Sequence, residues 1–204
     1  MLAIIDYGVG NLLSLQCSLK KIGVEAVVTN DPDTIKKADR IILPGVGAFG
    51  DAAKKLRATG LVDTIKTEAE NGKPFLGICL GMQLLFEKGY EYGEHEGLGF
   101  IKGNVVALEG IIPENLNIPH MGWNALDFKC ESPIFKYIND GDCVYFVHSY
   151  HATDCDESVI ATAEYGVQVT AAVGKGNIFG CQFHPEKSGD TGLKILKAFC
   201  EIGE

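Results

Sequence analysis

Short apolar runs alternate with helical patterns over roughly the first 90 residues, and this alternation limits the fold more than any other feature. The expected strands are Ala3–Ile5, Val24–Val28, Arg40–Leu43 and Pro74–Ile78. The expected helices are residues 12–22, 34–38, 49–71 and 80–87. Strands joined through helices form right-handed crossovers and pair in parallel. Apolar runs without clean alternation suit strands that are covered on both faces. We therefore expect an α/β protein with a mainly parallel, twisted central sheet flanked by helices.

The second half of the chain has a different texture, in which strands and glycine-rich turns replace the helices. The expected strands are Phe100–Leu108, Val144–His148, Val159–Ala163, Val167–Val173 and Ile178–Phe183, and a last helix covers about 192–200. We expect these strands to add antiparallel pairs to the sheet. Because no linker, repeat or low-complexity segment interrupts the chain, residues 1–204 are interpreted as a single domain.

Charge and cysteine content exclude several classes of function. A net charge of −9 argues against a nucleic-acid binder or a protein that clings to anionic lipid. No secretory signal or membrane-spanning stretch is visible in the sequence. Seven cysteines without a C-x-x-C pair argue against a disulfide framework and a structural zinc site. We expect a reduced, cytoplasmic protein that needs no cofactor and no metal.

The most specific chemical motif is Gly77-Ile78-Cys79-Leu80-Gly81, which lies between an apolar strand and a helical pattern. It is the thiol counterpart of the G-x-S-x-G nucleophile elbow. Such an elbow would lift Cys79 above the carboxyl edge of the sheet, and the following helix would direct its positive end at the sulfur. Both effects favour a reactive thiolate. On this motif alone, a small buried cysteine at a strand end remains an equal alternative.

A cysteine nucleophile needs a base, and His184 is the best candidate among the five histidines. It follows the last apolar run, and Glu186 lies two residues further on. In extended backbone the two side chains could point the same way, so that the carboxylate orients the imidazole. Taken without the elbow, a strand-end histidine beside an exposed glutamate is the better interpretation.

Other motifs give weaker predictions. His148 and His151 could suggest a metal site, but no third ligand has suitable spacing. His95 lies among glutamates and is expected in a solvated acidic loop. The segment 45–50 formally matches G-x-G-x-x-G, but it does not follow the first strand and a proline precedes it, which disfavours dinucleotide binding. Its glycines could instead present N–H groups to an oxyanion.

Taken together, the elbow and the late His184-Pro185-Glu186 resemble class I glutamine amidotransferases. Further blocks are similar to a narrower family, the glutaminase subunits of imidazole glycerol phosphate synthase. These blocks span the chain in order and comprise Asp6–Leu12, Leu43–Phe49, Gly77–Phe86, Pro119–Asn124, His148–Tyr150 and Gln182–Ser188.

The resemblance implies a Cys79-His184-Glu186 triad that hydrolyses glutamine through a glutamyl thioester. It implies that Leu80 and the strand Gly45-Val46-Gly47 provide the oxyanion hole, and that Gln83, Ser149 and Tyr150 help to hold glutamine. A change of peptide orientation in residues 44–47 could switch the oxyanion hole on and off, because glycine accepts either sign of φ.

The resemblance also implies a heterodimer with a barrel-shaped cyclase subunit that uses the ammonia in histidine biosynthesis, with Trp123 and Asn124 at the interface. Without the resemblance, core packing is the preferred interpretation of Trp123. Two other hypotheses stay open: a glutaminase subunit that serves a different synthase, for example in pyridoxal phosphate formation, and a non-catalytic regulatory subunit of the same fold.

Overall fold

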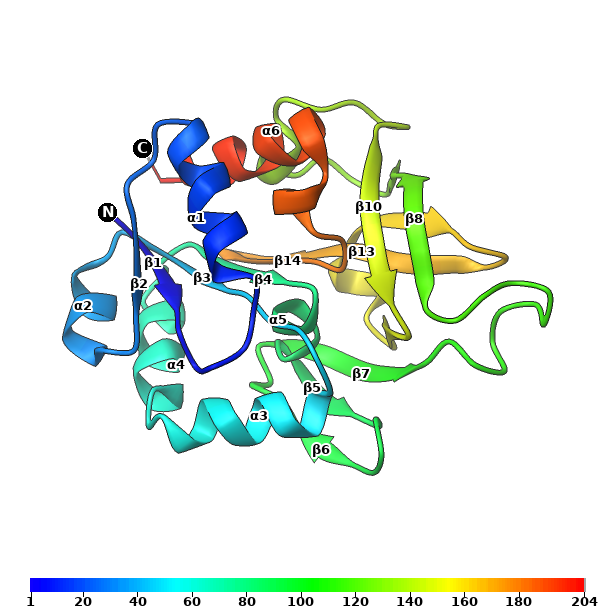
Figure 1. Ribbon diagram of the computed structural model, residues 1–204, viewed down its shortest axis with the longest axis horizontal. Helices are drawn as coiled ribbons and strands as arrows, with labels where there is room; N and C mark the ends of the chain where they lie inside the picture. The colour runs from blue at the N-terminus through cyan, green and yellow to red at the C-terminus, as the bar shows by residue number, and fades with distance from the viewer. Residues whose placement is uncertain (204) are drawn as a thin grey trace.

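The computed structural model describes residues 1–203 and has an eight-stranded central sheet with helices on both faces (Figure 1). The strand order is β2-β1-β3-β4-β14-β13-β12-β9. The first five strands in this order are parallel neighbours: β2 (Ala26–Thr29), β1 (Leu2–Ile5), β3 (Arg40–Leu43), β4 (Phe75–Ile78) and β14 (Ile178–Cys181). The last three pair antiparallel: β13 (Gln168–Lys175), β12 (Val159–Glu164) and β9 (Asp127–Phe128).

Two separate hydrophobic cores lie on the two faces of this sheet. Helices α1 (Leu12–Lys21) and α6 (Gly189–Cys200) cover one face, and α2 (Pro32–Lys37), α3 (Phe49–Ala58) and α4 (Val62–Glu70) cover the other (Figure 1). In β1 the neighbours Ile4 and Ile5 enter different cores, as expected for side chains that alternate across a strand. Both are fully buried, which explains why the strand sequences show no polar face.

Six further strands form two smaller sheets outside the central sheet. A four-stranded sheet has the order β11-β7-β5-β6, and β10 pairs with β8 in an antiparallel ribbon at the right of Figure 1. Their bounds are β5 (Phe86–Gly89), β6 (His95–Glu96), β7 (Ile101–Ala107), β8 (His120–Ala125), β10 (Cys143–His148) and β11 (Tyr150–Thr153). The remaining elements are the one-turn helix α5 (Leu80–Gln83) and the 3₁₀ turns η1 (Pro133–Phe135), η2 (Asp156–Ser158) and η3 (Pro185–Lys187).

The predicted fold class is confirmed, but two predicted helices are wrong in detail. The segment 49–71 forms two helices, because Gly60 adopts a left-handed φ of 72° between them. The helix expected over 80–87 ends at Gln83, and the chain continues into β5. The carbonyl groups of Leu84 and Leu85 accept hydrogen bonds from Leu98 and Ile101, so tertiary pairing replaces the helical bonds there.

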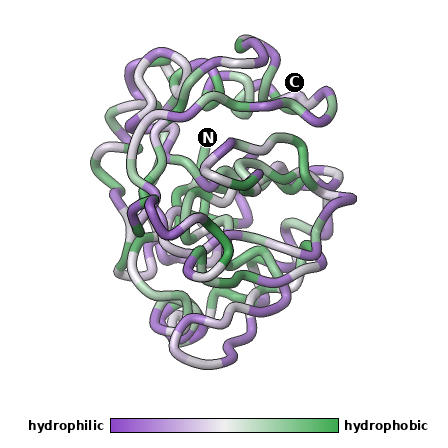
Figure 2. The backbone as a smooth tube through the Cα atoms, turned by 90° about the vertical axis from the view of Figure 1, so that its right-hand side faces the viewer, coloured by the Kyte–Doolittle hydropathy of each residue, from purple (hydrophilic) through white to green (hydrophobic). Residues whose placement is uncertain are grey.

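The hydropathy of the chain follows this layered arrangement. In Figure 2 green, hydrophobic segments run through the middle of the molecule, and purple, hydrophilic segments concentrate in the outer turns. Within residues 1–203, no helix has the length and apolar character that a membrane crossing requires.

Candidate active site

Cys79 lies at the sharp turn between β4 and α5. Its backbone has φ 53° and ψ −111°, an uncommon conformation for a residue with a side chain. Two backbone hydrogen bonds hold it: the Cys79 N–H donates to the Cys181 carbonyl at 2.7 Å, and the Cys79 carbonyl accepts from Gln83 at 3.1 Å. The turn therefore has the strained geometry of a nucleophile elbow.

The two glycines of the elbow are required by close backbone contacts. A Cβ atom on Gly77 would lie 2.6 Å from the carbonyl oxygen of Gly81. A Cβ atom on Gly81 would lie only 1.8 Å from the carbonyl oxygen of Leu43 on β3. Any larger residue at either position would displace the backbone that presents Cys79.

His184 follows β14 and forms a buried pair with Glu186. The His184 Nδ1 atom lies 2.7 Å from Glu186 Oε1, and both side chains are about 3% exposed. Burial disfavours the imidazolium, but hydrogen bonds to Cys79 and Glu186 outweigh it and raise the pKa of His184 to about 9. The sequence pair was expected in extended backbone, whereas the structure brings the side chains together through the turn η3.

Most of the predicted site residues meet around one cavity of about 330 Å³. The predicted residues that line it are Val46, Gly47, Cys79, Leu80, Gln83, Ser149, Tyr150 and His184. Gly45 and Glu186 lie beside it and line a smaller adjoining space together with His184. Four segments that are distant in sequence thus contribute to one site.

The backbone of residues 44–47 faces the elbow with a carbonyl group. The Leu80 N–H, an expected oxyanion donor, donates instead to the Gly45 carbonyl at 3.3 Å. The preceding peptide is fixed by the buried Tyr7, whose hydroxyl donates to the Pro44 carbonyl at 2.7 Å. Burial, reinforced by the nearby Cys79, raises the pKa of Tyr7, so this hydroxyl keeps its proton.

The predicted interface residues lie outside this cavity, on β8. Trp123 is 55% exposed, and its ring lies edge-on to Tyr145 with centroids 6.0 Å apart. Core packing is therefore the wrong interpretation of Trp123. Asn124 is half-buried and donates from Nδ2 to the Glu164 carbonyl at 2.9 Å.

Sequence reasoning missed two polar residues of the site. Gln182 is completely buried, its Nε2 atom lies 3.9 Å from the Cys79 sulfur, and its Oε1 atom accepts from Gln83 at 3.1 Å. Glu91 lines the same cavity, and its carboxylate accepts from the Phe49 N–H at 2.7 Å. A glutamine inside a buried apolar strand was the available signal for Gln182, whereas the acidic loop gave no signal for Glu91.

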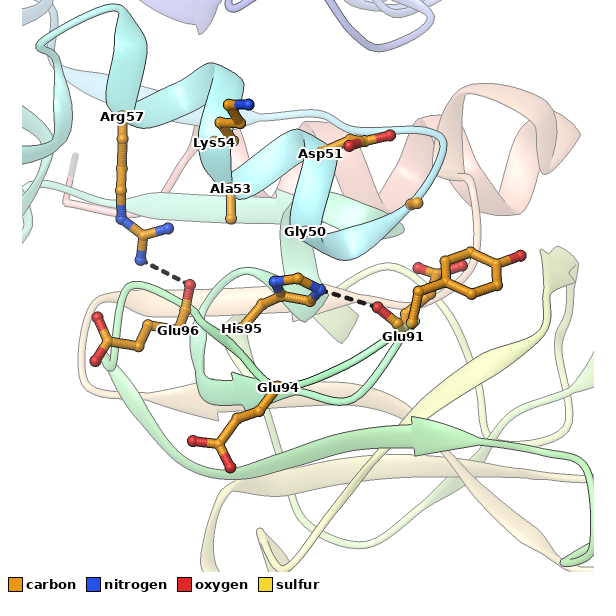
Figure 3. Close-up of a pocket in the computed structure, with 11 residues that line it drawn as sticks. Gly50, Asp51, Ala53, Lys54, Arg57, Glu91, Glu94, His95 and Glu96 are labelled. Carbon is orange, nitrogen blue, oxygen red and sulfur yellow. Dashed lines mark hydrogen bonds between the residues drawn. The ribbon is translucent and has the colours of Figure 1, made fainter.

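The expectation that His95 lies in a solvated loop is wrong. Its ring packs against Gly50 at the start of α3, and its Nε2 atom lies 3.1 Å from the Glu91 carbonyl (Figure 3). It lines a separate surface cavity of about 560 Å³ together with Lys54 and Arg57 (Figure 3). Among residues 1–203, no group of three or more potential ligands could hold a metal ion, at His148 and His151 or elsewhere.

A family model and individual relatives agree on the family that this chain resembles. The family described as "Glutamine amidotransferase class-I" matches residues 3–202. The "Imidazole glycerol phosphate synthase subunit HisH" of Caldanaerobacter subterraneus subsp. tengcongensis is 54% identical, with 99% of this chain and 98% of the relative covered. The subunit of the same name from Aquifex aeolicus is 52% identical, with coverages of 96% and 94%.

Solved structures support the fold independently. A chain of PurLQS from Thermotoga maritima superposes with a TM-score of 0.76 at 22% identity, covering 98% of this chain and 96% of that one. A crystal structure of a glutamine amidotransferase superposes with a TM-score of 0.74 at 19% identity, with coverages of 97% and 98%. At these identities the likeness concerns the fold alone.

Proposed function

Since the chain belongs to the class I glutamine amidotransferases, as a relative of the HisH subunits of imidazole glycerol phosphate synthase, we propose that Cys79, His184 and Glu186 hydrolyse glutamine and that a cyclase subunit consumes the ammonia. The chain is accordingly an enzyme of histidine biosynthesis that hydrolyses glutamine. One observation carries the assignment of residues: the buried His184–Glu186 pair interacts with Cys79 at a strained elbow beside a cavity.

The first half-reaction forms a thioester. The Cys79 sulfur attacks the carboxamide carbon of glutamine, a C–S bond forms, and the C=O electron pair moves to the oxygen. His184, which is charged at neutral pH, donates its proton to the departing nitrogen as the C–N bond breaks. Ammonia leaves and glutamyl thioester remains, while Glu186 holds the imidazole in place.

The second half-reaction restores the enzyme. The now neutral His184 removes a proton from water, whose oxygen attacks the thioester carbon. The C–S bond then breaks, glutamate leaves, and the sulfur and imidazole return to their starting state. The α-amino and α-carboxyl groups of glutamine need polar partners, and Gln83, Ser149, Tyr150 and the carboxylate of Glu91 are at hand around the cavity.

The oxyanion hole is incomplete in this arrangement. The Gly45 carbonyl occupies the Leu80 N–H, so this donor is not free to bind an oxyanion. Turning over the Gly45–Val46 peptide would move the carbonyl away and bring an N–H toward the same place. This rotation changes ψ of Gly45 and φ of Val46, and Gly45, as a glycine, accepts backbone conformations that other residues avoid. We infer that the free subunit idles and that residues 44–47 change orientation during activation.

An idling state fits the proposed use of the ammonia. Ammonia that escapes into water is protonated and no longer a nucleophile, so hydrolysis should be coupled to a partner that uses it. The proposed partner is a cyclase barrel in a heterodimer, which acts on a phosphoribulosyl-imidazole-carboxamide and makes imidazole glycerol phosphate and an aminoimidazole carboxamide ribotide. The exposed Trp123 and neighbouring Asn124 on β8 supply an anchor of the kind that interfaces use.

No cofactor enters either half-reaction. All seven cysteines are free thiols, which supports a reducing, cytoplasmic location. Full-length similarity to HisH subunits argues against a different synthase, and the intact Cys79, His184 and Glu186 argue against a non-catalytic regulatory subunit.

Cys79→Ala tests the proposed function. The variant should lose glutamine-dependent synthesis by the assembled synthase, while added ammonium salt still supports the cyclase reaction. Glutamate release and cyclase product are measured in parallel, with and without the cyclase ligand. Retained glutamate release in the variant would refute the role of Cys79. Loss of the ammonium-supported reaction would show that the substitution damaged assembly instead.

A further inference from the structure

A chain of hydrogen bonds leads from the glutamine cavity to the exposed strand β8. It begins at the Tyr150 carbonyl, which lies 2.9 Å from His148 Nδ1. The His148 Nε2 atom lies 3.0 Å from His120 Nδ1. His120 Nε2 lies 2.8 Å from Asn124 Oδ1, and Asn124 Nδ2 donates to the Glu164 carbonyl. The reaction steps above use neither histidine.

Both imidazoles of this chain are enclosed. His120 is fully buried and His148 is 6% exposed. The ring of His120 is stacked between Phe146 and Tyr165, with centroid distances of 4.8 Å and 3.9 Å. Such packing fixes the direction in which each ring nitrogen points, so hydrogen bonds made by these rings can hold other groups in place.

The Tyr150 carbonyl is the point at which this chain meets the active site. It accepts a second hydrogen bond from Gln83 Nε2 at 3.0 Å, and His148, Ser149 and Tyr150 all line the cavity. Two donors thus fix the peptide between Tyr150 and His151. We propose that His148 is a positioning residue that fixes this wall of the glutamine cavity, and that His120 extends the fixing to Asn124 on β8. The inference rests on the proposed function.

Counting protons makes this pair unusual. The chain of hydrogen bonds ends on two carbonyl oxygens, those of Tyr150 and Glu164. Its four contacts need four protons. The Asn124 amide supplies one of them in either orientation, and two neutral imidazoles supply two. One contact therefore lacks a proton unless the histidine pair takes up a third ring proton.

The environment of the pair disfavours that third proton. Burial lowers the pKa of His148 to about 3, and the nearby His120, His151 and His184 lower it further. The hydrogen bond to the Tyr150 carbonyl acts in the opposite direction but is outweighed. Burial also lowers the pKa of His120, although its bond to Asn124 opposes this. A neutral pair with a proton between its rings has both rings in one tautomer: both Nδ1–H, which satisfies Tyr150, or both Nε2–H, which satisfies Asn124.

Two substitutions of His148 separate positioning from packing. His148→Asn keeps a donor near the Nδ1 position but removes most of the ring volume. His148→Phe keeps the volume but has no donor. We expect His148→Phe to raise the KM for glutamine about fivefold or more, the effect of one lost hydrogen bond, with kcat changed less than about twofold. In His148→Asn, the KM for glutamine should stay close to the wild-type value.

The reverse ranking, with Phe tolerated and Asn impaired, would show that His148 only fills space and would overturn the proposal. Tyr165→Phe is the matched control, because it keeps the ring stacked on His120 and removes only the hydroxyl that donates to Asn117. All variants are assayed in the assembled synthase. If the wild-type protein releases glutamate and His148→Phe matches it, this inference alone fails. If Cys79→Ala also releases glutamate, the proposed function fails.

Nitrogen-15 NMR of the imidazoles tests the proton count directly. His120 and His148 should both be neutral at pH 7.5 and both carry the proton on Nδ1, the tautomer in which His148 donates to the Tyr150 carbonyl. His120→Phe should abolish the coupling and leave His148 as the Nδ1–H form. Both rings as Nε2–H would leave the Tyr150 carbonyl without a donor from His148 and would overturn the proposal. Opposite tautomers would place two lone pairs or two N–H groups face to face at the centre and would contradict the arrangement.

Discussion

At the scale of single residues, the site depends on a charged imidazole inside the protein. His184 is almost completely buried, which opposes a positive charge, yet Cys79 and Glu186 favour that charge more strongly. Because Glu186 Oε2 has no hydrogen-bond partner within residues 1–203, the carboxylate acts on His184 through its other oxygen. Burying this charged pair costs desolvation free energy, which the interactions of His184 with Cys79 and Glu186 offset.

This electrostatic arrangement predicts how stability depends on pH. The pKa of His184 rises to about 9 on folding from about 6.5 in an unfolded chain. The stability that it contributes is therefore fully present below about pH 6.5 and is lost as the pH rises through about 9. Glu186→Gln should reduce that loss and lower the pKa of His184. Denaturant titrations between pH 6 and 10 check this, and equal slopes for both proteins would contradict it.

At the scale of elements, the elbow is a place where backbone segments lie unusually close together. The turn from β4 to α5 passes so close to β3 that a side chain at Gly81 would overlap the Leu43 carbonyl. The segment 44–47, for which we propose the oxyanion role, continues directly from β3. A change in either element is therefore transmitted to the other through backbone contacts, which deform less easily than side chains.

Gly81→Ala should consequently destabilise the protein by about 3 kcal/mol or more, at the upper end of overpacking effects. It should also abolish glutamine hydrolysis, because Cys79 would move with the backbone. Gly174→Ala on β13 is the matched control, since its Cβ would meet side chains alone, Ile160 at 3.2 Å and Phe179 at 3.4 Å. Chemical denaturation and glutamate release measure both effects. A Gly81→Ala protein as stable as the control would refute this account of the elbow.

At the scale of the whole molecule, the chemistry and the proposed interface occupy neighbouring regions. The cavity lies at the carboxyl ends of β3, β4 and β14, and the ribbon of β10 and β8 stands beside it (Figure 1). His148 on β10 lines the cavity, and its register partner His120 on β8 leads toward the exposed Trp123. A partner bound on β8 would therefore act on the glutamine cavity through one strand pair.

Trp123→Ala tests this arrangement. The side chain is exposed and its loss should leave the fold intact, but an interface anchor typically contributes about 2 kcal/mol or more, or about 30-fold in affinity. Titration calorimetry with the cyclase should show that loss. Tyr92→Ala, which removes an aromatic that is 89% exposed between β5 and β6, should bind the cyclase as the wild type does. Equal losses in both variants would remove β8 from the interface.

Local patterns predicted much of this molecule. The parallel strands and the glycine-flanked turn at Cys79 depend on residues close in sequence, so propensity and motif geometry predicted them. The pairing of Cys79 with His184 and Glu186 was a prediction from the two motifs together and from the family resemblance. The same reasoning failed where distant strands determine local structure. The helix after Cys79 stops at Gln83 because later backbone amides take the carbonyl groups that would have continued it.

The sequence by itself determined the kind of chemistry and the succession of early strands and helices along the chain, because apolar periodicity and an elbow motif are local properties. Only the tertiary structure decided which polar groups meet. It placed Gln182 beside Cys79 and Glu91 at the same cavity, directed the Gly45 carbonyl at the Leu80 amide, and joined His120 to His148. Each of these contacts joins segments far apart along the chain, and their distance is set by the packing of whole strands.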